Sequence, residues 1–278
     1  MDEKWVRIME GNSTFTLTDL EGLTFLDANE DGVDVKVNST ETQGTDGVML
    51  GPTSFGPFPL VLRFFYRGVD TRDYKLMKQK LRGMLFRRTP FYIVHSDMPG
   101  KKYAVYCEDN AISDIAHKYG TFEITFTVYK GYSESLLTTD EMSLSNQTEW
   151  QFGNNMIAFN EADNYHHRTK TFRIYNGSDD VIDPTLRHAL NITIHTNAPN
   201  GFKLRNRKTG DVFEYYGSLL YTDTFMLKGV YPVVNGKRVG SDTNNSWITL
   251  EKGFNDFIVT GEGITDFDIT FSFSFIYR

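Results

Sequence analysis

The chain has 278 residues, of which 40% are hydrophobic and 14% aromatic, and its formal net charge is −7. This length exceeds one ordinary compact domain, so we expect two domains of roughly 100 to 150 residues each, and the aromatic content excludes a disordered chain. The single cysteine, Cys107, excludes an intrachain disulfide, and the sequence has neither a leader pattern nor ~20 consecutive apolar residues, so we expect no signal peptide and no membrane insertion.

Charge is distributed unevenly along the first half of the chain. Residues 1–50 contain three basic and eleven acidic residues, a net of −8, whereas residues 63–102 contain eleven basic and three acidic residues, a net of +8. The basic segment also carries regular apolar positions, which favours a solvated or partner-facing surface over a nucleic-acid site. We therefore expect an acidic and a basic patch on the first domain.

The first 60 residues read as short strands followed by a long irregular stretch. Val33, Val35 and Val37 alternate with polar residues, as in a strand. The pattern dissolves over residues 38–59, which are rich in Thr, Gly and Pro, and a loop of this length is usually functional or disordered. The alternatives are a mobile surface loop and an arm that reaches a neighbouring subunit. The arm residues we expect are Gly44, Val48, Leu50, Phe55 and Phe58.

A strand over residues 60–67 precedes the one helix that the sequence predicts clearly. Asp70 is a suitable helix cap, and the helix should continue to about residue 88. The expected core face has apolar residues at spacings of three and four, namely Tyr74, Met77, Leu81 and Leu85.

Further strands are predicted over residues 91–95, 103–107 and 122–129. The polar passage over residues 133–147 is the best linker candidate, so we expect an N-terminal domain over residues 1–135 and a C-terminal domain over residues 136–278.

The second half is typical of a β-sandwich. Turn signals such as Asn235-Gly236 recur at short intervals between apolar runs. The final strand alternates apolar and polar residues, and its expected core residues are Phe267, Ile269, Phe271, Phe273 and Phe275.

No motif predicts a catalytic, cofactor-binding or metal-binding residue. Nucleotide-binding glycine loops and nucleophile elbows are missing, and the adjacent His166 and His167 would point to opposite faces of a strand. Trp150 and Trp247 could form a sugar-stacking platform, although packing in a core is the commoner role for Trp in strands. We therefore expect that the protein is not an enzyme and needs no cofactor.

The order of these features resembles the distal tail (Dit) protein family of siphophages. The resemblance rests on residues 62–66, the helix with Tyr74, Leu81 and Leu85, residues 99–106 and 120–130, and in the second half residues 234–237, 247–250, 253–255 and the final strand. Each motif is loose, but together the motifs cover most of the chain, and their order and spacing are more specific than any single match.

The resemblance implies a mainly β virion structural protein of the baseplate hub at the phage tail tip, made in the host bacterial cytoplasm. Its N-terminal β-rich domain with one α-helix would form a homohexameric ring, and a galectin-like, carbohydrate-binding-module-like β-sandwich would project from it. The implied partners are the tail tube protein, the tail-associated lysin or spike protein and receptor-binding proteins, with DNA only passing through the channel.

Three alternatives remain open at this point. The first is a carbohydrate-binding module for host attachment, the second a tail tube protein, and the third, less favoured, a glycan-active enzyme.

Overall fold

The protein consists of two compact units in a computed structural model that describes residues 4–11, 13–30, 32–112, 119–142, 153, 155 and 164–278, with the backbone alone over 108–112. Unit 1 comprises residues 1–134 together with Arg278, and unit 2 comprises residues 135–277. The division lies one residue before the boundary expected from the sequence.

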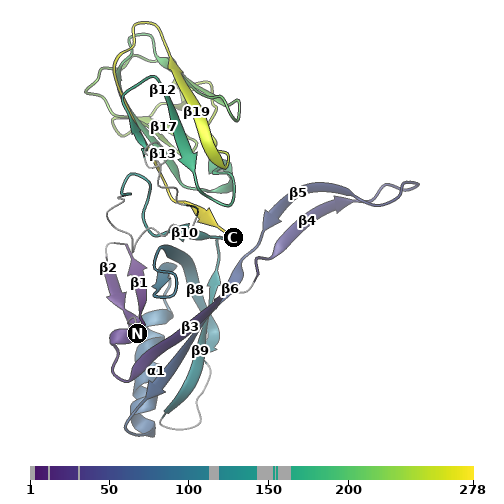
Figure 1. The fold of residues 1–278 in the computed structure, drawn as a ribbon, viewed down its shortest axis with the longest axis vertical. Coiled ribbons are helices and arrows are strands. Elements are labelled where there is room, and N and C mark those ends of the chain that lie inside the picture. Colours follow the sequence, from purple (N-terminus) through teal and green to yellow (C-terminus); the bar gives the residue numbers. More distant parts are fainter. Residues whose placement is uncertain are drawn as a thin grey trace. The chain divides into compact units, whose positions relative to one another are not determined.

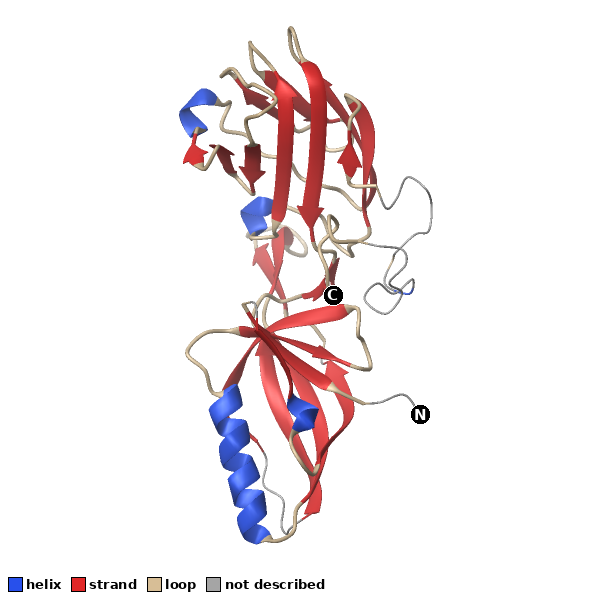
Figure 2. Ribbon diagram, turned by 90° about the vertical axis from the view of Figure 1, so that its left-hand side faces the viewer, coloured by secondary structure: helices blue, strands red, loops and turns tan. Residues whose placement is uncertain are grey.

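In its described residues, unit 1 is built mainly from strands and one α-helix, α1 (Thr71–Leu85) (Figure 2). Its other elements are β1 (Val6–Glu10), β2 (Ser13–Thr16), the 3-10 turn η1 (Leu17–Asp19), β3 (Leu23–Glu30), β4 (Val35–Thr40), β5 (Met49–Phe55), β6 (Phe58–Arg67), β7 (Phe91–His95), β8 (Lys101–Ile112), β9 (Tyr119–Val128) and β10 (Ser133–Ser135).

The main sheet of unit 1 is antiparallel and follows the order β2-β1-β7-β8-β9-β6-β3. Alternate residues of β6 and β9 point into one core, as period-2 patterns require. The buried residues of these two strands are Phe58, Leu60, Leu62, Phe64, Tyr66, Phe122, Ile124, Phe126 and Val128.

Helix α1 begins where the sequence predicts. The Asp70 carboxylate accepts hydrogen bonds from the amides of Arg72 and Asp73 at 2.7 and 2.8 Å, which satisfies two of the free N–H groups of the first turn. The helix packs on the sheet core through the four residues of the expected face, Tyr74, Met77, Leu81 and Leu85, and ends at Leu85.

Unit 2 is a sandwich of two antiparallel sheets, ordered β11-β20-β13-β16-β17-β18 and β12-β19-β14-β15. Its strands are β11 (His166–His167), β12 (Thr171–Asn176), β13 (Leu190–Asn197), β14 (Phe202–Asn206), β15 (Val212–Tyr215), β16 (Phe225–Lys228), β17 (Tyr231–Val234), β18 (Lys237–Arg238), β19 (Gly253–Thr260), β20 (Thr265–Phe273) and β21 (Ile276–Tyr277), with 3-10 turns η3 (Pro184–Leu186) and η4 (Gly240–Asp242).

Aromatic rings from both sheets fill the space between them. Phe271 of β20 lies 5.0 Å from Phe257 of β19 and 6.0 Å from Phe172 of β12, measured between ring centroids. The five expected core residues, Phe267, Ile269, Phe271, Phe273 and Phe275, are all buried. The strand itself stops at Phe273, and the next four residues are all buried, so the alternation does not continue to the end as predicted.

The predicted linker over residues 133–147 is wrong for its described part, which ends at residue 142. Ser133, Ser135 and Thr139 are buried, and Ser135 and Thr139 are bonded to the backbone of unit 2. Polar side chains indicated exposure here, but their hydroxyls and backbone groups are satisfied in the interior.

No helix in the described ranges is long and apolar enough to cross a membrane.

Candidate assembly surface

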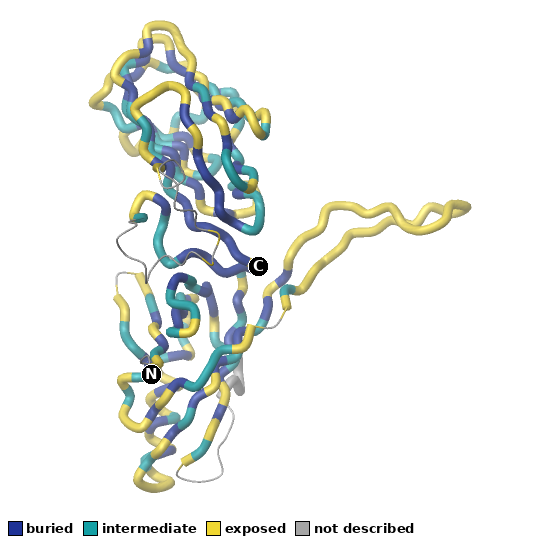
Figure 3. Tube along the Cα trace, in the orientation of Figure 1, coloured by how far each residue is buried: buried dark blue, intermediate teal, exposed yellow. Residues whose placement is uncertain are grey.

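The most prominent surface feature of unit 1 is a two-stranded ribbon, β4 and β5, which we call the arm (residues 35–55). It continues the β3–β6 pair outward from the body, and every residue in it is exposed (Figures 1 and 3). The expectation of an irregular stretch over residues 38–59 is therefore wrong, because β5 and the start of β6 lie within it. The sequence does not predict strand β5 because Gly51 and Pro52 lie within it, and both residue types are uncommon in strand interiors.

One face of the arm carries four of its apolar side chains, Val35, Val37, Leu50 and Phe55. Val35 pairs with Phe55, and Val37 with Thr53, in the antiparallel register. Beyond them the register shifts, because Gly51 and Pro52 lie opposite Asn38 alone, and Ser39 then pairs with Leu50. A bulge of this kind restores the phase of the side chains, so Leu50 points to the same side as the two valines and Phe55.

The exposed fractions of these apolar side chains are large. They are 54% for Val35, 48% for Val37, 73% for Leu50 and 38% for Phe55. An isolated ribbon is only marginally stable in water, and a group of exposed apolar side chains on one face usually marks a contact surface. The arm is thus built to lie against another surface.

The base of the arm is fixed to the body of unit 1. The Gly56 amide donates to the Asp34 carbonyl oxygen at 2.6 Å. The Arg278 guanidinium lies over the Phe55 ring, 3.6 Å from its centroid, and donates to the Gly131 carbonyl oxygen at 3.2 Å. Gly131 has a φ of +73°, and a Cβ there would lie 2.8 Å from the Gly56 carbonyl oxygen. A side chain at Gly131 would therefore push the arm away from this support.

The expected arm residues do not all belong to the arm. Gly44 lies in the turn that joins its strands, with a φ of +90°, and Val48 and Leu50 are exposed near the tip. Phe58 is a correction: it begins β6 and is buried in the sheet core, so it cannot anchor a neighbour.

The charge separation seen in the sequence is partly neutralised within unit 1. Arg63 pairs with Asp27, and Arg87 pairs with Glu10, so each pair joins the basic segment to the acidic one. The expectation of separate acidic and basic patches is to that extent wrong, because strand pairing brings the two segments together.

A basic surface nevertheless remains on α1. The helix carries one acidic residue, Asp73, against five basic ones, and all of the basic residues but Lys78 are exposed. These basic residues are Arg72, Lys75, Lys78, Lys80 and Arg82.

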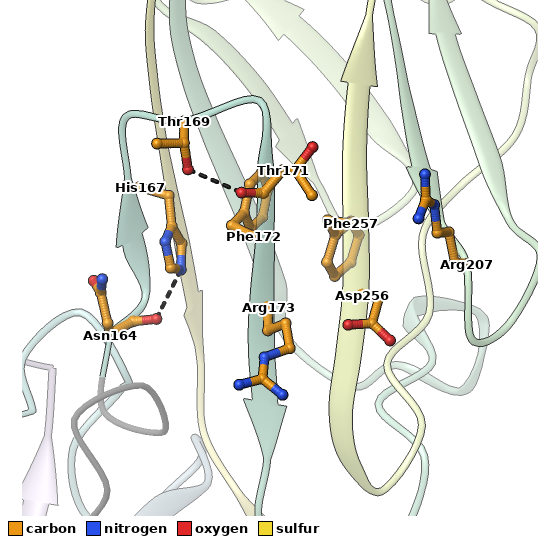
Figure 4. A pocket seen from close by; sticks show the side chains of 9 residues that line it. All are labelled: Asn164, His167, Thr169, Thr171, Phe172, Arg173, Arg207, Asp256 and Phe257. Carbon is orange, nitrogen blue, oxygen red and sulfur yellow. Dashed lines mark hydrogen bonds between the residues drawn. The ribbon is translucent and has the colours of Figure 1, made fainter.

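Unit 2 has a shallow groove beside β12 and β19 (Figure 4). Arg173 and Asp256 are register partners on these strands. The aromatic rings beneath them form a stack, in which His167 lies 4.7 Å from Phe172 and Phe172 lies 5.4 Å from Phe257. The His167 Nε2 atom is 2.9 Å from the Asn164 carbonyl oxygen, and burial lowers the pKa of its imidazole.

This groove does not present a sugar-stacking platform, because Phe172 and Phe257 are buried. Trp247 is exposed on unit 2, contrary to the preference for core packing, while Trp150 lies outside the described residues. The part of the chain that the structure describes contains no cluster of three metal-ligating side chains; His166 instead pairs with Asp268 at 2.8 Å.

Comparison with known proteins connects unit 1 to phage tails. Residues 13–128 match the family model of the phage tail protein RIFT-related domain. No curated protein matches the sequence significantly.

Solved structures extend the comparison to the whole chain. The Dit protein of phage SPP1, described as a paradigm of the hub adsorption apparatus in phages that infect Gram-positive bacteria, matches with a TM-score of 0.68 and 14% identity over 97% of this chain and 99% of its own. Chains of the phage P2 baseplate in its activated conformation match with TM-scores of 0.44 with Ca and 0.43 with Sr, both at 10% identity and over at least 97% of each chain.

Residues 13–128 therefore match a phage tail domain, and the whole chain shares the fold of the SPP1 protein, both in the direction of the resemblance seen in the sequence. The matched domain is a structural domain of phage tails, which agrees with the expectation that the chain is not an enzyme.

Proposed function

Because residues 13–128 match a phage tail domain and the chain has the fold of the SPP1 Dit protein, we propose that it is the distal tail protein of a siphophage. Six copies form a ring at the tail tip, which joins the tail tube to the tail-associated lysin or spike protein. The central channel passes DNA, and receptor-binding proteins dock outside it.

The observation that carries this proposal is the exposed apolar face of the arm. A ribbon whose apolar side chains remain largely exposed beyond its base needs a surface on a neighbour. A contact between the arm of one copy and a different surface of the next is heterologous, and such contacts repeat around a ring until it closes.

The two units have separate roles in this proposal. Unit 1 forms the ring, because it carries the arm and the tail-domain match. Unit 2 is a galectin-like sandwich that docks other baseplate proteins. Glycan binding by unit 2 is less well supported, because the rings under its groove are buried.

Removal of the arm tests the proposal. In the test variant, residues 36–54 are replaced by Asn-Gly, so that the register partners Val35 and Phe55 are joined through a two-residue turn. The body of unit 1 should keep its fold, because no residue in the deleted span is buried.

We expect the wild-type chain to form closed hexamers in light scattering and electron micrographs, and the variant to be a folded monomer. The matched control is Tyr231→Ser, which changes an exposed residue of unit 2 and should leave the ring intact. A variant that still forms the wild-type ring would contradict the role of the arm.

A further inference from the structure

A small hollow lies beside the start of α1 in unit 1. It is lined by the apolar residues Leu20, Val69, Leu76 and Met77 together with the polar residues Glu21, Tyr66, Arg67, Asp73 and Lys80. Its volume is about 180 Å³, below the several hundred Å³ typical of small-molecule sites and suited to one or two side chains.

Two of the lining residues are far more exposed than apolar side chains of their size usually are. Val69 is 83% exposed and Leu76 is 52% exposed. Of the two acids in the lining, Glu21 and Asp73, the Asp73 carboxylate already accepts a hydrogen bond from the Val69 amide at 3.0 Å. An apolar side chain entering the hollow would therefore bury Val69 and Leu76 without leaving Asp73 unpaired.

The tip of the arm carries side chains of the right kind. Val48, Met49 and Leu50 are consecutive, and the latter two are at least 70% exposed. Met49 and Leu50 point to opposite faces of β5. Leu50, on the face of Val35 and Phe55, is therefore the side chain placed like the apolar anchors that fill pockets at the centre of protein interfaces.

The arm cannot fill the hollow of its own subunit. The arm leaves the body at Phe58, where β6 begins, whereas the hollow is lined by Arg67, where β6 ends. A ten-residue strand separates them, which is about 33 Å, and the arm points away from α1 (Figure 1). Contact between tip and hollow therefore requires two copies.

Charge favours the same pairing. Residues 34–55 carry three acids, Asp34, Glu41 and Asp46, against one basic residue, Lys36. Helix α1, beside the hollow, carries five basic residues against one acid. Opposite charge on two surfaces that are far apart in one copy steers a head-to-tail contact and disfavours arm-to-arm pairing.

We infer that Leu50 at the arm tip of one copy enters the hollow beside α1 of the next copy. Glu41 and Asp46 then face the basic residues of that helix. This inference rests on the proposed ring, and it names the surface that the arm contacts.

Disulfide trapping tests the contact directly. In a Cys107→Ala background, Leu50→Cys and Leu76→Cys are combined in the full chain and exposed to a mild oxidant. We expect covalent multimers up to the hexamer on a non-reducing gel. The control combines Leu50→Cys with Tyr231→Cys, an exposed position in unit 2, and should give at most a trace of cross-linking.

Two further variants separate the contact from the fold. Leu76→Asp should abolish the ring while the melting curve stays that of a folded monomer, because Leu76 is half exposed. Lys80→Glu should raise the concentration of half-assembly about fivefold, the size that an exposed ion pair supports, and Asp46→Lys should restore it.

The outcomes distinguish the inference from the proposed function. A ring that forms normally, shows no cross-link between residues 50 and 76, and tolerates Leu76→Asp would overturn the docking site and leave the ring standing. A wild-type chain that forms no ring under any condition would overturn both.

Discussion

Separating unit 2 from unit 1 should require a cut before Ser133, although the sequence alone favours a later one. Ser135 and Thr139 attach the segment that precedes residue 143 to the last strands of the sandwich. The Ser135 amide donates to the Phe275 carbonyl oxygen at 2.8 Å, and the Phe275 amide donates to Ser135 Oγ at 3.0 Å. The Thr139 amide and hydroxyl donate to the carbonyl oxygens of Phe273 and Phe271, both at 2.9 Å, and the Phe273 amide donates to Thr139 Oγ1 at 3.2 Å.

A fragment that begins at residue 146 loses all five of these hydrogen bonds. Each contributes about 1 kcal/mol to stability, so the loss is about 5 kcal/mol, and the stability of a whole domain is only about 5 to 15 kcal/mol. We therefore expect residues 133–278 to fold and unfold cooperatively, and residues 146–278 to be insoluble or to melt far lower.

Thermal and urea unfolding of the two fragments, followed by circular dichroism, gives the comparison. The matched point variant is Thr139→Val in the full chain, which keeps the shape of the side chain but removes its hydroxyl. The Phe271 carbonyl oxygen loses a donor and the Phe273 amide loses this acceptor, so the free energy of unfolding should fall by about 2 kcal/mol. Equal stability of the two fragments would refute the reasoning and support the linker that the sequence suggests.

Three other predictions concern single side chains. Phe271→Ala should lower the free energy of unfolding by about 3 to 5 kcal/mol in urea titrations, because its buried ring packs against rings of the facing sheet. Thr270→Ala should lower it far less, because Thr270 is half-buried on the opposite face of the strand. Equal effects would contradict the core assignment. Burial lowers the pKa of His95, whose ring nitrogens have no hydrogen-bond partner in the described ranges, so the folded state disfavours its protonation. Stability of unit 1 should therefore fall as the pH drops below about 6.5, the value of an unperturbed histidine, and His95→Phe should reduce this loss between pH 7.5 and 5; an unchanged pH profile would exclude the role of His95. Arg278→Ala should speed hydrogen exchange of the Gly56 amide about two- to fivefold, because the cation–π contact with Phe55 at the arm base is lost; unchanged exchange would show that Arg278 does not hold the arm.

The sequence predicts best where a regular period coincides with burial. The 3.6-residue period of Tyr74, Met77, Leu81 and Leu85 and the cap at Asp70 define α1, because the same side chains face the core in the structure. The alternation from Phe267 to Phe273 marks β20 for the same reason.

The arm escapes prediction because no core imposes a pattern on it. Its apolar residues include Val35 and Leu50, whose common face depends on a bulge at Gly51 and Pro52. The bulge breaks the two-residue period, and its two residues are typical of loops. The strand is visible only once the pairing with β4 is known.

The charge pattern and the polar passage before unit 2 mislead for a related reason. Asp27 and Arg63 are far apart in sequence but pair across β3 and β6, and Thr139 is polar but buried. Long-range pairing decides the environment of such residues, and a single sequence does not reveal it.

The most direct test of the proposed function is the assembly state of the full chain, alone and with the tail tube and lysin proteins proposed as its partners. Light scattering should give a mass of six chains, and class-averaged electron micrographs should show closed six-fold rings that vanish when residues 36–54 are replaced by Asn-Gly. A chain that stays monomeric at high concentration and beside those partners would contradict the proposal.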